Sequence, residues 1–109
     1  MPLDPQARAF IDQMQAAGIR QAHQMTVEEA RAASLARVRL AGGTPIPVDR
    51  VEDRTVPGPD REIPVRVFAP ASEEPLPVLA YFHGGGWIRG SIETHEAACR
   101  YVANEARIL

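Results

Sequence analysis

The N-terminal part of the chain begins with an apolar pattern at helical spacing. Asp4 and Pro5 suit a helix start, because aspartate caps free N–H groups and proline has no N–H to lose. Four apolar side chains then share one face of such a helix: Ala7, Phe10, Ile11 and Met14. Gly18 is expected to end this helix.

A second helix is predicted a few residues later. Thr26 and Glu29 are spaced three apart, as in a capping box, where each side chain bonds the other residue's backbone N–H. The alanine-rich stretch from Val27 to about Leu40 follows, and Gly42-Gly43 is expected to end it. Its apolar face consists mainly of alanine, so the helix needs a partner surface to be stable.

The middle of the chain has the pattern of a β-hairpin. Residues 48–56 and 62–68 are strand-like, and the cluster Pro57-Gly58-Pro59-Asp60 between them predicts a turn. The second strand alternates, with Ile63, Val65 and Val67 on one face and Glu62 and Arg66 on the other. This alternation is typical of a half-exposed antiparallel pair, and Pro64 favours an edge or a bulge.

Residues 78–82 are apolar without alternation, which predicts a strand buried on both faces, as in a parallel sheet. Three glycines, Gly84–Gly86, follow almost at once. They allow positive φ angles and expose backbone N–H groups at the carboxyl end of the strand. Donors of this kind can form an oxyanion hole, although a tight turn with no role at a site is the alternative.

A helical pattern returns from about residue 94 to residue 106. Its expected inner side consists of Ala97, Ala98, Tyr101, Val102 and Ala106. Arg107-Ile108-Leu109 then resembles the start of a second buried strand. A strand, a helix and a parallel strand form a right-handed crossover, so we expect an α/β fold and the N-terminal part of a longer protein.

Composition adds few constraints. The chain has 109 residues, 45% hydrophobic and 24% charged, which suits one small domain or part of a larger one. A net charge of −2 gives no attraction to nucleic acid or to an anionic membrane. A single cysteine, Cys99, fits a reducing compartment, and neither a signal peptide nor a membrane span is evident, so we expect a cytoplasmic protein.

The stretch His83-Gly84-Gly85-Gly86-Trp87 after a strand resembles the oxyanion loop of the hormone-sensitive-lipase-like esterases, the HGGG-type bacterial family IV of the α/β-hydrolase fold. The resemblance continues through Gly90-Ser91 and Thr94-His95 and reaches back to the strand at 63–68. It implies a helical cap segment at residues 1–45. Residues 46–109 would be an incomplete core with hairpin, first parallel strand, oxyanion loop and crossover helix.

The resemblance also implies roles at the site. The amides of Gly84 and Gly85 would donate to an oxyanion, and Gly86 would let the backbone pass close to that oxygen. His83 and Trp87 would flank and brace the loop. A helical hairpin packed on the core, with no role at the site, remains the alternative for the two N-terminal helices.

The catalytic nucleophile of such enzymes is missing from the sequence. They need Gly-x-Ser-x-Gly, followed by Asp or Glu and then His. Ser34 lies in a predicted helix, Ser72 in a loop, and Ser91 lacks a second flanking glycine. His83 and His95 both precede the expected place of the triad histidine. We therefore assign no catalytic residue here and expect the isolated chain to be inactive.

Other ligands are less well matched. His95 and Cys99 could share a helix face with His83 nearby, but zinc needs three or four supported ligands. Phosphate binding would need Gly-x-Gly-x-x-Gly or a Lys-Ser/Thr pair, and both are absent. We expect no metal and no cofactor.

The sequence leaves three hypotheses for function. The first is a serine carboxylic ester hydrolase that acts on short- to medium-chain esters, as the resemblance implies. Its full-length form could be a homo-oligomer. The second is a non-catalytic small-molecule receptor of the same fold, like the plant hormone receptors that resemble these esterases. The third is an inactive fragment.

Overall fold

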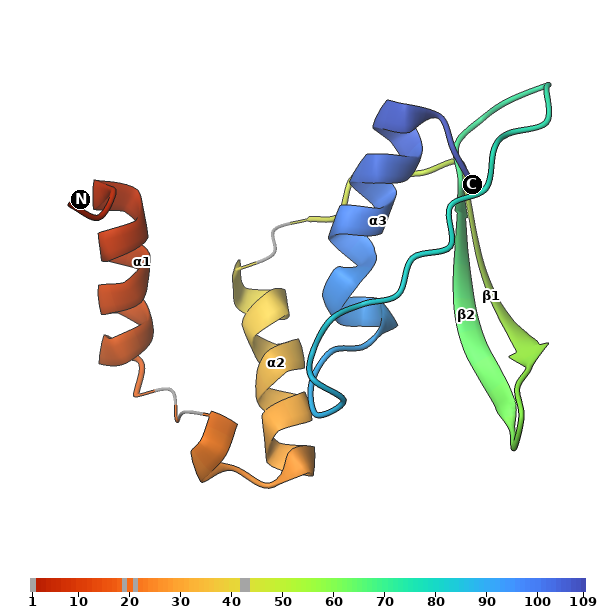
Figure 1. Cartoon of the computed structure of the whole chain (residues 1–109). Helices are drawn as coiled ribbons and strands as arrows, with labels where there is room; N and C mark the ends of the chain where they lie inside the picture. Colours follow the sequence, from red (N-terminus) through yellow and green to blue (C-terminus); the bar gives the residue numbers. More distant parts are fainter. Residues whose placement is uncertain (1, 19, 21, 42–43) are drawn as a thin grey trace.

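The computed structural model describes residues 2–18, 20, 22–41 and 44–109 (Figure 1). In chain order, the elements are α1 (Pro5–Ala16), a short 3₁₀ helix (Ala22–Gln24), α2 (Val27–Ala41), β1 (Arg50–Pro57), β2 (Glu62–Ala69) and α3 (Ile92–Ala106). The predicted helix stop at Gly42-Gly43 lies outside the described residues.

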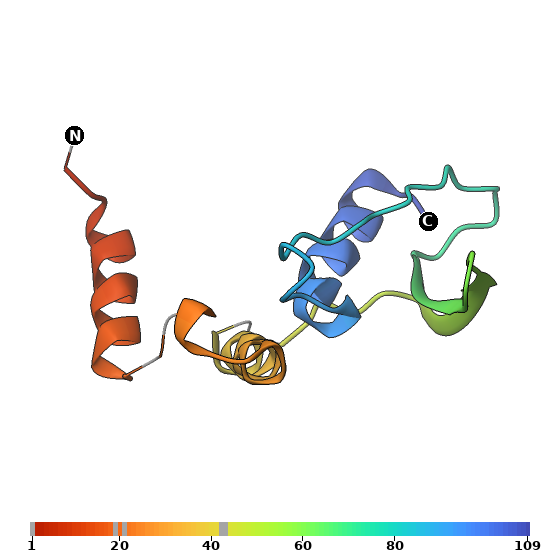
Figure 2. The same ribbon diagram turned by 60° about the horizontal axis from the view of Figure 1, so that its bottom comes forward.

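The start of α1 agrees with the prediction. The Asp4 carboxylate accepts hydrogen bonds from the amides of Gln6, at 2.8 Å, and Ala7, at 3.4 Å. Gly18 adopts φ 63° just beyond the end of the helix, as expected of a terminating glycine. The predicted apolar face stays largely exposed at Phe10 and Ile11, because α1 stands apart from the rest of the chain (Figures 1 and 2).

The start of α2 is a capping box, as predicted. The Thr26 amide donates to Glu29 Oε2 at 2.8 Å, and the Glu29 amide donates to Thr26 Oγ1 at 3.2 Å. Arg20 adds an ion pair to Glu29 at 2.7 Å. This helix packs against α3 and buries Ala30. Helix α3 is therefore the partner surface that the alanine-rich helix requires.

Strands β1 and β2 form the predicted antiparallel hairpin, in register from Arg50 opposite Ala69 to Pro57 opposite Glu62. The turn is closed by the Gly58 amide, which donates to the carbonyl of Arg61 at 3.1 Å. The first strand begins at residue 50, two residues later than predicted.

Burial in β2 increases along the strand and does not follow its alternation. Phe68 and Ala69 lie on opposite faces and are 8% and 5% exposed, whereas Ile63 near the start is 43% exposed. The face carrying Arg66 and Phe68 meets α3, because Arg66 forms an ion pair with Glu96 of that helix and Arg100 lies 5.5 Å above the Phe68 ring. Alternation alone gave no sign that the face carrying Arg66 contacts a helix.

The segment at 77–82 is extended and pairs with the last residue of the chain. The Leu109 amide donates to the Pro77 carbonyl and the Leu79 amide donates to the Leu109 carbonyl, both at 2.8 Å. Two bonds flanking Val78 in this way form a parallel bridge. They give the predicted parallel pairing across α3 at one point, although neither the 77–82 segment nor residues 107–109 form a regular β-strand in the described structure.

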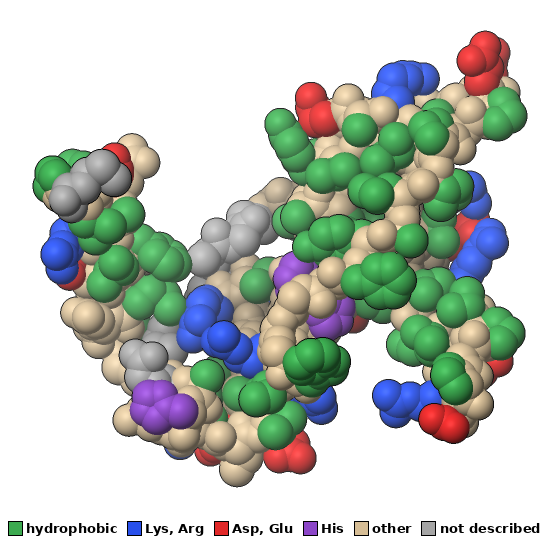
Figure 3. Space-filling model, in the orientation of Figure 1, with side chains coloured by type: hydrophobic (Ala, Val, Ile, Leu, Met, Phe, Trp, Pro, Cys, Tyr) green, Lys and Arg blue, Asp and Glu red, His purple; other side chains and the backbone are tan. Residues whose placement is uncertain are grey.

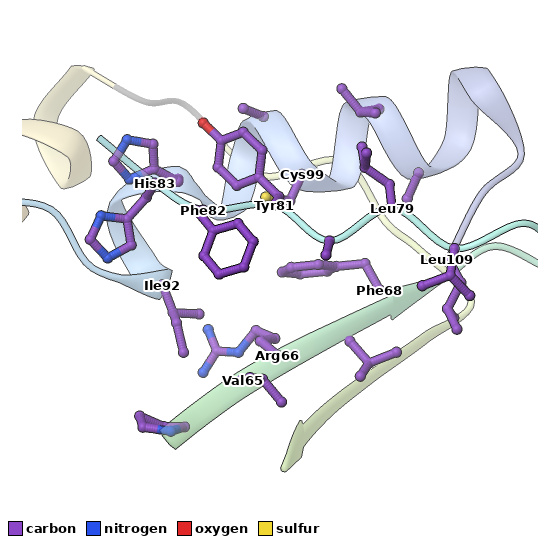
Figure 4. Close-up of a pocket in the computed structure, with 18 of the residues that line it drawn as sticks. Val65, Arg66, Phe68, Leu79, Tyr81, Phe82, His83, Ile92, Cys99 and Leu109 are labelled. Carbon is purple, nitrogen blue, oxygen red and sulfur yellow. The ribbon is translucent and has the colours of Figure 1, made fainter. Parts of the chain in front are cut away.

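The predicted burial of residues 78–82 on both faces is wrong for this chain, because Val78 and Phe82 are 73% and 89% exposed. Leu109 is the segment's only backbone hydrogen-bond partner among the described residues. Toward β2 it faces a cavity of about 1000 Å³ that α3 closes on a third side (Figure 4).

Helix α3 begins at Ile92, two residues before the predicted start, with Ser91 as its N-cap. It ends at Arg107, which takes a left-handed φ of 51°. The predicted inner side is only partly right. Ala98 and Val102 line the cavity, but Tyr101 is exposed and the buried residue is Ala103. The helix contacts both α2 and β2, and the side that carries Ala98 and Val102 faces the cavity.

The hydrophobic core of the described residues is small. Its buried members are Ala30, Phe68, Ala69 and Ala103, and many larger apolar side chains lie on the surface (Figure 3). Within the described residues, none of the helices combines the length and apolar character that crossing a bilayer requires.

Candidate functional site

The glycine loop connects the extended segment at 77–82 to the N-terminus of α3. The Gly85 carbonyl closes a tight turn by accepting the amides of Ile88, at 3.1 Å, and Arg89, at 2.9 Å. Ser91 then caps α3, and its amide donates to Thr94 Oγ1 at 2.8 Å. The loop is therefore held by hydrogen bonds at the Gly85 turn and at the N-cap of α3.

Two glycines are required by the loop itself. Gly85 has φ 144°, and a Cβ there would lie 1.8 Å from the Arg89 carbonyl oxygen. Gly90 has φ 91°, and a Cβ there would lie 2.5 Å from the Gly84 carbonyl oxygen. Both values are far inside contact distance, so no other residue fits these positions without moving the backbone.

Gly84 differs from these two positions. Its φ lies outside the left-handed range, and a Cβ there would meet no atom within 4 Å. Neither the loop conformation nor the packing of the described residues explains a glycine at this position. The space where a Gly84 side chain would lie is open to a group from outside the chain.

The amides of the three glycines are unused. Among the described residues, no acceptor is hydrogen-bonded to the backbone N–H groups of Gly84, Gly85 or Gly86. The whole stretch from residue 81 to residue 89 is exposed. Free donors on an exposed loop can bind a carbonyl oxygen or an anion.

His83 is held at the start of the loop by two contacts. Its Nδ1 lies 3.0 Å from the Gly84 carbonyl oxygen, a hydrogen bond that requires the proton on Nδ1. Its ring stacks on that of His95, with centroids 5.2 Å apart and planes 19° apart. His95 is anchored on the first turn of α3, where its Nδ1 lies 2.9 Å from Thr94 Oγ1. The two histidines thus link the loop to the helix.

Trp87 takes the left-handed conformation with φ 59°, which is uncommon outside glycine. Its side chain is 97% exposed and packs against nothing in the described part of the chain. The predicted bracing by its ring therefore stays a prediction. Its backbone is part of the tight turn.

Sequence reasoning missed Arg31 of α2 as a loop contact. Its Nε donates to the Ile88 carbonyl at 3.1 Å, and its Nη2 lies 3.5 Å from the Trp87 carbonyl oxygen. Arg31 and Ile88 are 57 positions apart in the sequence, so no local pattern predicts their contact. Helical periodicity indicates which face of the helix a residue lies on, but not which segment that face contacts.

The hairpin and α3 are joined by a charged cluster near the loop. Arg66 contacts Asp53 at 2.6 Å and Glu96 at 2.8 Å, and Arg100 contacts Glu96 at 2.6 Å. The hydrogen bond from Arg66 lowers the pKa of Asp53. The pKa of Glu93 is lowered as well, chiefly by its own backbone amide and by the Ser91 side chain. This cluster fixes α3, and with it His95, relative to the hairpin.

The described serines and Cys99 have other surroundings. The Ser91 hydroxyl accepts the Thr94 amide at 3.3 Å, and the Ser72 hydroxyl contacts the Glu74 backbone, so neither is bonded to a histidine ring. Burial raises the pKa of the Cys99 thiol, which keeps it protonated. In the described ranges, no three His, Cys, Asp or Glu side chains gather closely enough to hold a metal ion.

Comparison with known proteins extends this picture. A family profile described as the α/β-hydrolase fold matches residues 79–109. An arylesterase of Saccharolobus solfataricus is 34% identical over 105 residues, which are 95% of this chain and 34% of the relative. The carboxylic ester hydrolase LipN of Mycobacterium tuberculosis is 44% identical over 66 residues, which are 61% of this chain and 17% of LipN.

A solved structure shows the same arrangement. The hyperthermophilic esterase of Pyrobaculum calidifontis matches with a TM-score of 0.88 and 38% identity, covering 99% of this chain and 34% of the esterase. The chain thus spans about a third of the length of its full-coverage relatives. It belongs to the α/β-hydrolase fold family, among the esterases that resemble hormone-sensitive lipase.

Proposed function

We propose that the protein containing this chain hydrolyses carboxylic esters and that this chain supplies the oxyanion-hole donors. The observation that carries the proposal is the set of amides at Gly84, Gly85 and Gly86, which have no acceptor among the described residues and lie on an exposed loop after the extended segment at 77–82. The names of the relatives, an arylesterase and a carboxylic ester hydrolase, support the same reaction class.

The chemistry requires a stabilised negative charge. Attack on an ester carbonyl gives a tetrahedral intermediate whose oxygen becomes an anion, and each well-placed donor contributes about 10²–10³ in rate. In this proposal the amides of Gly84 and Gly85 donate to that oxygen, and Gly86 lets the backbone approach it. His83 holds the loop through its stack on His95. The nucleophilic serine, the acid and the triad histidine lie outside these 109 residues.

The substrates in this proposal are short- to medium-chain esters, aryl esters among them. Residues 1–45 form part of a cap and residues 46–109 belong to the catalytic core. Cys99, a free cysteine, fits a reducing compartment such as the cytoplasm.

An esterase hybrid tests this function. We define it as the arylesterase of Saccharolobus solfataricus with its matching segment replaced by this chain. The hybrid is expected to hydrolyse p-nitrophenyl acetate and butyrate. Gly84→Ala should lower its kcat/KM by about 10²-fold, because the new methyl group occupies the space that the substrate oxygen needs. The loop itself should tolerate the change, since that methyl group meets nothing within 4 Å.

Gly18→Ala is the control. It adds the same methyl group at a position that is also open, in the link after α1, but with φ 63° it strains the backbone more than Gly84→Ala does, so an unchanged activity there shows that strain alone does not lower turnover. Its kcat/KM should stay within about twofold of the parent hybrid. A folded hybrid without esterase activity, or an active hybrid in which Gly84→Ala has no effect, would contradict the proposal.

A further inference from the structure

Arg31 links α2 to the turn that follows the glycines. Its Nε donates to the Ile88 carbonyl at 3.1 Å, and Nη2 lies 3.5 Å from the Trp87 carbonyl oxygen. The first is a good hydrogen bond and the second is long. In Figure 1, α2 runs beside the loop that leads into α3.

The turn needs support of this kind. Gly86 and Trp87 are consecutive residues in the left-handed region, with φ 58° and 59°. This conformation is unfavourable for tryptophan, and it persists only where the surroundings hold it. The Trp87 ring is almost fully exposed and contributes no packing. Support must therefore come through the backbone.

Arg31 is the donor that the backbone carbonyls use. Among the described residues, no other group donates to the carbonyls of Trp87 and Ile88. A guanidinium suits this task because its planar fork offers several N–H groups at once, whereas a lysine ammonium is a single point of charge.

The contact reaches the glycine amides through the Gly85 carbonyl, which accepts the amides of both Ile88 and Arg89. This carbonyl lies in the same planar peptide group as the Gly86 N–H, so the position of Ile88 is coupled directly to the Gly86 amide and, through the Gly85 Cα, to the Gly85 amide. A shift of about 1 Å in an oxyanion donor is enough to impair catalysis strongly.

We propose that Arg31 is a positioning residue for the glycine loop: it fixes the left-handed turn at Gly86–Ile88 and thereby sets the direction of the amides of Gly84–Gly86. The catalytic consequence rests on the proposed esterase function. Helix α2 is then part of the apparatus that shapes the site, and not only a cover or a packed hairpin.

Nuclear magnetic resonance of this chain tests the positioning without any need for activity. The Arg31 Nε–H should exchange with water several-fold more slowly than that of Arg39, which lies on the same helix, is exposed and makes no polar contact in the described structure. Arg31→Ala should shift the amide resonances of residues 84–88. It should also speed exchange of the Ile88 and Arg89 amides by about tenfold, because their bonds to Gly85 open more often.

Arg39→Ala is the matched control and should leave those resonances and exchange rates unchanged. If Arg31→Ala loses its helical far-UV circular dichroism signal, Arg31→Lys tests the positioning role instead. Lysine keeps the positive charge and the aliphatic part of the side chain but lacks the planar guanidinium group. Arg31→Lys should reproduce the loop shifts with the helical signal intact. Loop amides that are unchanged in every folded Arg31 variant would overturn the proposal.

The esterase hybrid gives the catalytic arm. Arg31→Ala should lower kcat by about tenfold with KM within about twofold, since a misplaced donor weakens the transition state and not substrate binding. A raised KM with unchanged kcat would show that α2 only covers the substrate. A hybrid that is inactive before any substitution would count against the esterase function, while the resonance measurements would still decide the role of Arg31.

Discussion

At the residue scale, the three glycines have different reasons to be glycine. Gly85 is fixed by backbone conformation and by a contact that no side chain can satisfy, and Gly86 by its positive φ. Gly84 has neither constraint, so its small size is best explained by an approaching ligand. The motif thus combines residues that build the loop with one that leaves room above it.

This difference predicts unequal effects on stability. Gly85→Ala should lower the free energy of unfolding by about 2 kcal/mol or more, because it combines an unfavourable φ with a clash against the Arg89 carbonyl. Gly84→Ala should change it by no more than about 1 kcal/mol. Urea unfolding of the chain and the two variants measures both values. Equal losses at the two positions would contradict this assignment.

At the element scale, the hairpin and α3 are held together by charge as much as by apolar contact. Arg66 and Glu96, whose side chains are each 18% exposed, form the central pair, and Asp53 and Glu93 lie beside Arg66. Ion pairs of limited exposure are costly to break, because removing one partner leaves the other charge unpaired. The cluster holds the helix whose first turn carries His95.

The cluster predicts a dependence of stability on pH. The pKa values of Asp53 and Glu93 are lowered in the folded chain, so their contribution is present above the unfolded pKa values, near 4, and is lost as pH falls through the folded ones. The urea midpoint should be flat above about pH 5 and fall below about pH 4. Arg66→Met should lower the midpoint at pH 7 and reduce this acid slope by the part that Asp53 contributes, since the Glu93 pKa is lowered chiefly by its own amide and by Ser91. An unchanged slope in Arg66→Met would contradict the role of the cluster.

Local signals predicted the elements well, and contacts between elements poorly. The Asp4 cap, the Thr26–Glu29 capping box and the hairpin turn depend on residues within a few positions, and the structure confirms them. The contact of β2 with α3 and the inner side of α3 depend on pairs such as Arg66 with Glu96, which are 30 positions apart. The alternation of apolar residues does not predict such a distant partner. For the same reason it did not predict the contact of Arg31 with the glycine loop.

At the scale of the whole molecule, helix α3 with the two extended segments that pair beside it, the hairpin, and helices α1 and α2 surround a site that is open to solvent. Leu109 pairs in parallel with the segment at 77–82, while a cavity of about 1000 Å³ separates that segment from β2. The glycine loop lies at the end of this segment, between it and α3, and Arg31 contacts it from α2. Three parts of the chain thus meet at one loop.

The central claim is that the glycine amides bind a developing oxyanion. The most direct test is a crystal structure of the esterase hybrid after reaction with a phosphonate ester, which stops the enzyme at a tetrahedral stage. We predict that the phosphonyl oxygen lies about 2.7–3.1 Å from the amide nitrogens of Gly84 and Gly85. A phosphonyl oxygen held by other groups, with both amides facing water, would contradict the account.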